Sequence, residues 1–291
     1  MLEGIRIIEL EGLGPGPFAA MMLADLGADV IVVHRPSPSV STMPEQNIID
    51  RGKRSIVLDL KNKDDFANMK KLIATADGLI EGFRPGVMEG LGLGPEVVHK
   101  DHPGLVYGRM TGWGQNGPKA KDAGHDLNYI ALSGALWYAS SAGTPPFTPP
   151  TLAGDIGGGA LYLVAGILAG LLRAQNTGKG TVIDAAIVDG SAHMMNLLMS
   201  TQAAGLLSPI RGESFLDGPP WSRCYACADD EWVSVQCLEP KFYAVFIEKL
   251  DLKNDPDFNQ QNDQSVWPKM TARLEQLFSQ YPLKHWQELF E

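Results

Sequence analysis

The chain has 291 residues, of which 44% are hydrophobic and 20% are charged, and this ordinary globular composition excludes wholesale disorder. A formal net charge of −10 argues against general binding to nucleic acid or to an anionic membrane, although a local basic patch can still hold a phosphate. Three cysteines, an odd number in a long chain, do not describe a disulfide framework and favour a reducing, intracellular compartment.

No signal sequence precedes the first strand pattern, and no apolar run reaches the ~20 residues that span a bilayer. We therefore expect a soluble intracellular protein that is not bound to a membrane. The cytoplasm is the first expectation for its location, and a mitochondrion or a peroxisome is the alternative in a eukaryote.

Strands and helices alternate through the first 110 residues. Strands are predicted at 5–10, 29–33, 55–60, 78–82 and 105–110, and helices at 18–26, 64–76 and around 95–100. This order predicts an α/β domain with a Rossmann-like parallel sheet. The glycine-rich turn 12–17 lacks the third glycine of a dinucleotide fingerprint, because Pro17 stands there, and His34 and Arg35 replace the ribose-binding acid. An NADP enzyme is therefore a minor alternative.

Positive charges are concentrated in part of this acidic chain, at Arg35, Arg51, Lys53, Arg54, Lys61 and Arg84. Three of them, Arg35, Lys61 and Arg84, lie at or just past a predicted strand end, which is the edge where open α/β sheets bind ligands. Two interpretations stay open at this point: a site for a phosphate-rich small molecule, and a solvated basic loop.

Residues 124–134 change from polar to apolar, as at the start of a helix. Backbone N–H groups at a helix start have no partner within the helix and can bind an anion or a developing oxyanion. The positive end of the helix dipole also favours a neutral imidazole, which can accept a proton. His125 is therefore a candidate base, and simple capping or packing is the alternative.

Asp155 stands beside several glycines, just before an apolar helix predicted at 160–174. An N-cap is the simplest interpretation of an aspartate at this place. Because glycines have no side chains, they would also let a ligand or a second backbone approach the carboxylate closely. Between the two stretches, residues 140–150 hold four prolines and are predicted to be irregular.

A strand at 181–184 and a helix at 191–204 complete the predicted large domain, residues 1–205. A loop at 207–220 then leads into a smaller α+β domain, so that 206–291 comprises a linker and this second domain. A hairpin is predicted there, and it places Cys224 and Cys227 on opposite faces of a strand, which excludes a shared metal ion. Helices are predicted at 241–249 and 267–280.

The motifs of this chain resemble, in their order, those of the α-methylacyl-CoA racemases within the class III (CaiB/BaiF-type) CoA transferases. The similar segments are the opening strand with its glycine-rich turn, Arg35-Pro36, residues 51–55, 58–61, 84–87 and 110–115, the stretch from Gly124, Gly154-Asp155, residues 178–180 and Glu239-Pro240. A histidine at position 125 is typical of the racemases, since the transferases generally lack it and use an aspartate as acyl-carrying nucleophile.

The resemblance implies a proton exchange at the carbon next to a thioester carbonyl, through a planar enolate. His125 and Asp155 would serve as the two bases, Glu239 would orient His125, and neither a metal nor an organic cofactor would be required. The enolate would be stabilised by N–H donors at the start of the helix. The CoA portion would be bound by Arg35, Leu58, Asp59, Leu60, Lys61, Arg84, Gly124, Asp126, Leu127, Asn128 and Tyr129.

Three departures from the family pattern stand out. Thr151 replaces an asparagine four residues before the aspartate, and Gly90 replaces an arginine that would contact phosphate. Family members also continue beyond position 291 and form interlocked homodimers, so a homodimer is expected, and the chain is expected to be a fragment or a short form with an incomplete second domain. A CoA transferase with Asp155 as nucleophile and a non-catalytic CoA-binding protein are the alternative functions.

Overall fold

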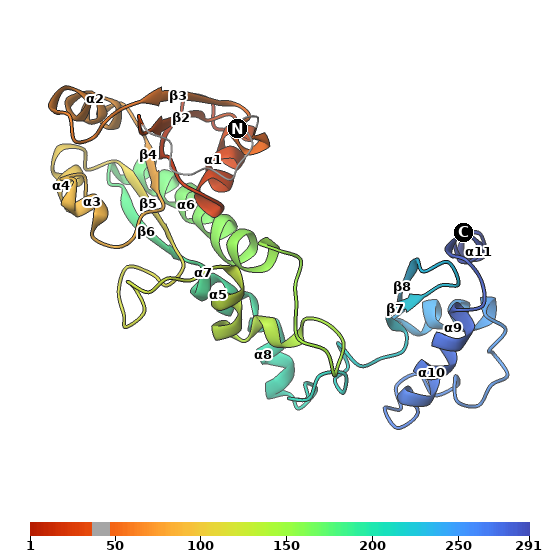
Figure 1. The fold of residues 1–291 in the computed structure, drawn as a ribbon. Helices are drawn as coiled ribbons and strands as arrows, with labels where there is room; N and C mark the ends of the chain where they lie inside the picture. The colour runs from red at the N-terminus through yellow and green to blue at the C-terminus, as the bar shows by residue number, and fades with distance from the viewer. Residues whose placement is uncertain (37–46) are drawn as a thin grey trace. The chain divides into compact units, whose positions relative to one another are not determined.

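A six-stranded parallel sheet forms the centre of the first part of the molecule (Figure 1). The computed structural model describes residues 1–36 and 47–291. The strand order is β3-β2-β1-β4-β5-β6, which confirms the predicted α/β class, and the order reverses between β1 and β4. The strands are β1 (Arg6–Leu10), β2 (Asp29–His34), β3 (Lys53–Val57), β4 (Gly78–Glu81), β5 (Val106–Thr111) and β6 (Thr181–Ala186).

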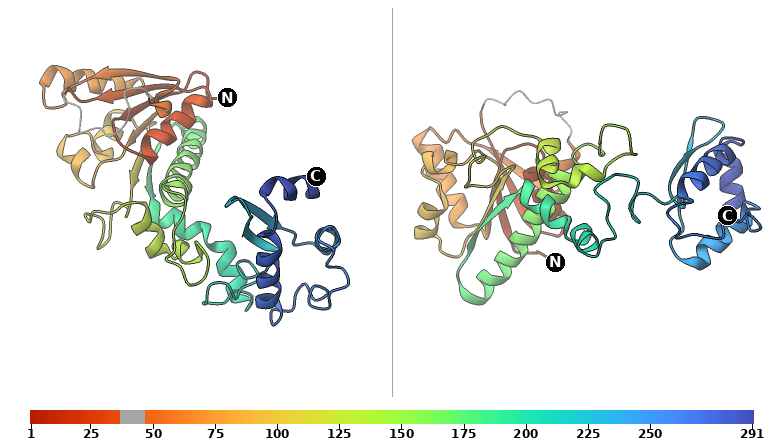
Figure 2. Two further views of the ribbon diagram at one scale, coloured as in Figure 1. Left: turned by 45° about the vertical axis from the view of Figure 1, so that its right-hand side comes forward. Right: turned by 90° about the horizontal axis from the view of Figure 1, so that it is seen from below.

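Helices cover both faces of this sheet, so its inner strands are apolar on both sides. The ribbon views in Figure 2 show the helices beside the sheet. Ile7 packs on the face covered by α1 (Pro15–Asp25) and α6 (Leu161–Thr177). Its neighbour Ile8 points to the other face, as alternation along a strand requires. That second face is covered by α2 (Lys63–Ala74), α3 (Val87–Gly90) and α4 (Pro95–Asp101).

Two predicted helix boundaries are wrong. The first helix begins at Pro15 instead of residue 18, because a proline near a helix start loses no intrahelical hydrogen bond and has the required φ angle. The single helix expected at 191–204 is two helices, α7 (Ile187–Met194) and α8 (Asn196–Ala203). Short helical segments also occur at η1 (Ile48–Asp50) and η2 (Ala135–Tyr138).

Asp155 lies within a π-helix, η3 (Leu152–Ala160), which runs directly into α6. The aspartate is therefore not the N-cap of the long helix. The glycines around it do admit a second backbone: a Cβ on Gly158 would lie 2.7 Å from the backbone nitrogen of Ser191 and 2.8 Å from the carbonyl oxygen of Ile187, so α7 packs directly against η3. This packing places the start of η3 beside α5 (Asp126–Ser133).

Thr151 precedes η3 in the left-handed conformation, with φ of 64°, and its carbonyl accepts the N–H of Ile156 at 2.9 Å. A β-branched residue is strained there, whereas asparagine adopts this conformation readily. We expect Thr151→Asn to raise the free energy of unfolding by about 1 kcal/mol, measured by urea denaturation. Thr151→Val retains the branched Cβ and should bring no gain; an equal gain from both variants would contradict the strain argument.

The stretch Leu152–Thr177 is long and apolar enough, by length and composition, to cross a membrane, contrary to our sequence expectation. It is also a core element of the sheet domain. Leu163, Ile167 and Leu171 are buried in the cluster that includes Ile7 of β1. A helix whose buried side chains pack on a sheet has the same composition as a spanning helix, so we interpret this stretch as a core helix.

Residues 140–146 and 197–291 form a second compact unit, separate from residues 1–139 and 147–196. The predicted boundary after residue 205 stays a prediction. The expected hairpin is present, with antiparallel strands β7 (Ser222–Ala226) and β8 (Trp232–Gln236). Helices α9 (Pro240–Lys249), α10 (Trp267–Phe278) and α11 (Leu283–Phe290) complete the unit, and sequence reasoning missed the last of these.

The second unit has its own apolar core, in which Trp221, Phe258 and Phe278 are fully buried. Cys224 is exposed while Cys227 is buried, so the two thiols lie on opposite faces of the hairpin as expected. Within the described ranges, no group of three or more His, Cys, Asp or Glu side chains is arranged to hold a metal ion.

Candidate active site

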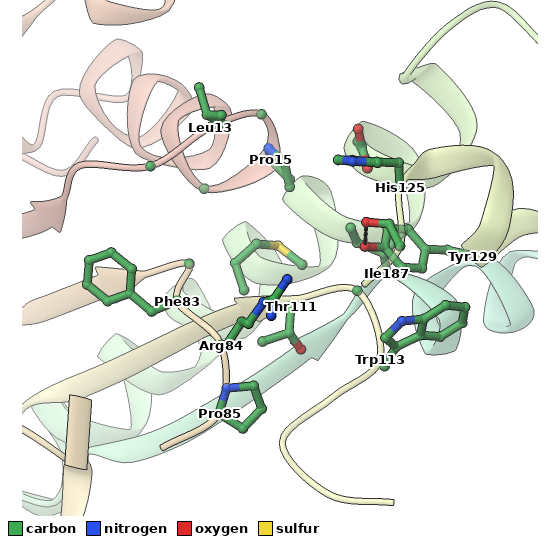
Figure 3. A pocket seen from close by; sticks show the side chains of 18 of the residues that line it. Leu13, Pro15, Phe83, Arg84, Pro85, Thr111, Trp113, His125, Tyr129 and Ile187 are labelled. Carbon is green, nitrogen blue, oxygen red and sulfur yellow. Dashed lines mark hydrogen bonds between the residues drawn. The ribbon is translucent and has the colours of Figure 1, made fainter. Parts of the chain in front are cut away.

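A cavity of about 400 Å³ lies at the carboxyl ends of β1, β4 and β5, beside the first turn of α1. Because the strand order reverses between β1 and β4, this is the position at which open α/β sheets bind ligands. His125 and Asp155 both line the cavity. Figure 3 shows His125 and Arg84 extending into it from different segments of the chain.

His125 is the residue from which α5 starts, which confirms the predicted helix start. Its backbone N–H donates to Oδ1 of Asn128 at 3.0 Å, so the backbone that carries the imidazole is fixed by the first turn. In the described part of the chain, the N–H groups of Asp126 and Leu127 have no hydrogen-bond partner. Two free donors at a helix start are suited to bind a negatively charged oxygen.

Asp155 reaches the cavity from η3 and is half-buried. Burial raises the pKa of its carboxyl to about 6, the negative charge of Asp126 acts in the same direction, and His125 opposes both. A carboxyl with a pKa near 6 is populated in both protonation states close to neutral pH. It can therefore act as a base in one step and as an acid in another.

Tyr129 holds the segment before His125 in place. Its hydroxyl donates to the carbonyl oxygen of Gly124 (dashed in Figure 3), and its ring packs edge-on against Trp113 with 4.7 Å between the centroids. Burial, and then the charge of Asp155, raise the pKa of the Tyr129 phenol. The phenol therefore stays neutral and serves as a fixed donor beside the two candidate bases.

The structure brings together five of the residues predicted for the site. These are Arg84, Gly124, His125, Tyr129 and Asp155. The other predicted contacts lie outside the cavity lining, at Arg35, Leu58, Asp59, Leu60, Lys61, Asp126, Leu127 and Asn128.

Arg35 and the 58–61 segment nevertheless lie at the same edge of the sheet, as expected. Arg35 directly follows β2, and its guanidinium is 3.7 Å from the Glu11 carboxylate. Residues 58–61 directly follow β3, where Lys61 is exposed and the Asp59 carboxylate accepts the Lys61 backbone N–H at 3.0 Å. Their role in CoA binding stays a prediction.

The cations of the basic segment 51–54 are paired with carboxylates in the structure, and a role of this segment in phosphate binding stays a prediction. Each of its cations has an acidic partner, in the pairs Arg51–Asp25, Lys53–Glu9 and Arg54–Asp29. The Lys53–Glu9 pair is almost completely buried, with 2.7 Å between Nζ and Oε2. These pairs therefore anchor β3 and the turn before it to neighbouring elements, and the sequence pattern did not reveal the partners because they are distant in the chain.

Glu239 belongs to the second unit, where it is exposed and its backbone forms the N-cap of α9. Its expected pairing with His125 stays a prediction.

Sequence reasoning missed several residues that shape the cavity. They include Leu13, Pro15, Phe83, Thr111, Trp113 and Ile187. Most of them follow the ends of β1, β4 and β5, so the strand-end rule that selected Arg84 could have found them too. Ile187 carried no signal, because it lies at the start of an apolar helix that was expected four residues later.

An imidazole and a carboxyl of raised pKa in one cavity, at the switch point of a doubly wound sheet, define an α/β enzyme equipped for acid–base chemistry. The chain belongs to CoA-transferase family III, whose family model matches residues 2–291.

The similar proteins include both racemases and transferases. The α-methylacyl-CoA racemases of Mus musculus and Homo sapiens are 40% and 42% identical to this chain, over all of it and 75% of their own length. The acetyl-CoA:oxalate CoA-transferase of Acetobacter aceti is 31% identical over 98% of this chain and 76% of its own. The crystal structure of a CaiB/BaiF family protein from Brucella suis superposes with a TM-score of 0.82 at 27% identity, covering 99% of this chain and 81% of that one.

Proposed function

We propose that the protein is an isomerase that epimerises the C2 centre of 2-methylacyl-CoA thioesters. The observation that carries this proposal is the pairing of His125 with Asp155 in one cavity, where the Asp155 carboxyl has a pKa of about 6. The identity of 40–42% to α-methylacyl-CoA racemases over the whole chain supports it. The histidine that resembles the racemase motif lies at the helix start, where a general base is required.

The reaction proceeds by two proton transfers. One group, His125 or Asp155, removes the C2 proton and leaves the bonding electrons in an enolate, whose negative charge rests on the thioester oxygen. The N–H groups of Asp126 and Leu127 receive that oxygen. The other group then donates its proton to the opposite face of C2, and the centre is inverted. The substrate neither gains nor loses atoms overall, so no co-reactant is consumed.

His125 favours this reaction over CoA transfer, because the transferases generally lack a histidine at this position. The pKa of Asp155 does not separate the two reactions, since a carboxyl with a pKa of about 6 is mostly ionised at neutral pH and is then available as a nucleophile. An acid–base group benefits from the same pKa. CoA transfer with Asp155 as nucleophile is the second candidate, because a relative named as a CoA transferase is also similar to this chain. The experiment below therefore tests both reactions.

Acyl-CoA is the proposed small-molecule partner, with Arg84 in the cavity and Lys61 at the sheet edge as the expected phosphate contacts. Neither the proton transfers nor the enolate requires a metal ion or an organic cofactor, and we propose that none takes part. A homodimer, an intracellular location and a role in lipid metabolism complete the proposal.

The experiment is a C2 exchange assay on the full chain. Incubation of (2R)- or (2S)-methylacyl-CoA in deuterated water should incorporate one deuterium at C2 and yield a mixture of both epimers, measured by mass spectrometry and chiral separation. An acid acceptor should not be required. Absence of exchange, together with an acyl adduct trapped by hydroxylamine in the presence of an acceptor acid, would establish transfer instead. CoA binding with neither reaction would indicate a non-catalytic protein.

A further inference from the structure

The carboxylate of Asp126 links the two candidate bases through the backbone. Asp126 follows His125 in sequence and is buried, with 7% of its surface exposed. Its Oδ1 accepts hydrogen bonds from two N–H groups of η3, those of Gly154 at 2.9 Å and Asp155 at 2.8 Å. The Oδ1 atom of Asp126 therefore links the residue that follows His125 to the backbone of Asp155.

Gly154 makes this contact sterically feasible. A Cβ on residue 154 would lie 2.5 Å from Oδ1 of Asp126 and 3.0 Å from a methyl carbon of Ile130, closer than side-chain atoms approach. Any larger residue at 154 would therefore push the carboxylate away from the start of η3. The glycine before Asp155 and the aspartate after His125 form one structural unit.

The Asp126 carboxylate also acts on Asp155 through its charge. After burial, it is the next cause of the raised pKa of Asp155, and the electrostatic effect of His125 opposes it. The neutral phenol of Tyr129 faces the same carboxyl. These three groups come from α5 and its N-cap residue. The other described elements that pack on η3, namely α1, α6, α7, β5 and β6, contribute no charge that shifts Asp155.

We propose that Asp126 is a positioning residue for the proton exchange. Its carboxylate holds η3 against the start of α5, so that His125 and Asp155 keep a fixed separation, and its negative charge disfavours a second negative charge on Asp155. Asp126 is absent from the residues that line the cavity in the described chain, so its carboxylate acts through Asp155, apart from the backbone N–H that we propose as a donor to the enolate oxygen. The inference rests on the proposed function and extends it.

The first test separates the charge from the hydrogen bonds. In Asp126→Asn the amide oxygen can still accept both N–H groups, but the negative charge is gone. The pKa of Asp155 should then fall below its value of about 6. For the epimer on which Asp155 is the base, kcat/KM rises as pH rises through this pKa. For the other epimer, on which Asp155 is the acid, it falls. In Asp126→Asn, both the rise of kcat/KM for the first epimer and its fall for the second should occur at lower pH than in the wild type.

The second test removes the hydrogen bonds. Asp126→Ala should lower kcat by about 10²-fold in both directions with little change in KM, because a small misplacement of a catalytic group has an effect of this size. Gly154→Ala displaces the carboxylate without changing any charge and should lower kcat similarly. Recovery of most of the activity in Asp126→Asn would assign the loss to the hydrogen bonds.

A readout that does not depend on turnover distinguishes the two proposals. The carboxyl carbon of Asp155, labelled with ¹³C, is titrated by NMR in the wild type and in Asp126→Asn. An unchanged pKa of Asp155, or wild-type kcat in a folded Asp126→Ala variant, would overturn the positioning role. Loss of C2 exchange in the wild type itself would overturn the proposed function, whereas the NMR titration would still decide the interaction between the two carboxyls.

Discussion

Replacing Asp155 by asparagine is expected to lower the rate of epimerisation by about 10³-fold, because an amide can neither accept nor donate the proton that the second face of C2 requires. His125 stays in the cavity of this variant and can still remove and return a proton on its own face. One epimer should therefore exchange its C2 hydrogen for deuterium without inversion, while the other should remain unlabelled.

His125→Asn is expected to give the complementary result. Epimerisation falls by about the same 10³-fold, and the residual deuterium enters the epimer that the Asp155 variant leaves unlabelled. The backbone N–H at position 125 still donates to Asn128 in this variant, and asparagine is itself a favourable N-cap residue, so the variant should fold as the wild type does. Mass spectrometry of both epimers, separated after single incubations in deuterated water, measures the pattern.

A matched control is Asp189→Asn, which makes the same chemical change at an exposed aspartate in α7, outside the cavity lining. Its rate should stay within a few-fold of wild type. Labelling of the same epimer in both variants would show that both groups act on the same face of C2 and would contradict the two-face assignment. Epimerisation at the wild-type rate in either variant would remove that residue from the mechanism.

The position of the site could be predicted from sequence, because strand ends and helix starts have local signals. The β-branched runs placed β1 to β5 to within a few residues, and the parallel order then fixed the edge at which Arg84 lies. The change from polar to apolar residues marked the start of α5 and, with it, His125. Each of these inferences needed only neighbouring residues.

The parts that could not be predicted depend on contacts between residues that are distant in sequence. Asp155 was expected at a helix N-cap, but it lies within a π-helix that packs on α7, and its backbone N–H donates to the Asp126 carboxylate. Asp126 was expected only as a CoA contact, and the pattern did not reveal that its carboxylate accepts backbone N–H groups 28 and 29 residues further along the chain. Lys53 was counted among the concentrated positive charges, and its partner Glu9 is 44 residues away. Nothing in the local pattern identifies such pairs.

A buried ion-pair cluster supports the cavity loop after β4. Arg109, on β5, donates from Nε to Oε1 of Glu81 at 2.9 Å and is also bonded to Glu89 of α3 at 2.8 Å. Glu81 is fully buried, and its second oxygen accepts the backbone N–H of Phe83 at 2.7 Å. Phe83 and Arg84 line the cavity, so this cluster fixes the segment that carries the cavity's arginine.

Arg109→Met is expected to lower the free energy of unfolding by about 3–5 kcal/mol, because it leaves Glu81 buried without its cation. Burial already raises the pKa of Glu81. Without Arg109 the folded protein should favour the protonated carboxyl still more strongly than the unfolded chain does. The protonated form of Glu81 is fully populated at low pH and is lost as pH rises through the pKa of the folded state. The loss in free energy of unfolding relative to wild type should therefore be larger at pH 8 than at pH 5.

Urea denaturation at the two pH values, beside two further variants, tests this prediction. Arg54→Met breaks an ion pair whose arginine side chain is 63% exposed, and it should lower stability by at most about 1 kcal/mol. Adding Glu81→Gln to Arg109→Met removes the stranded charge while its amide oxygen can still accept the Phe83 N–H, so much of the lost stability should return. An equal loss in the Arg109 and Arg54 variants would mean that burial does not set the energy of this cluster.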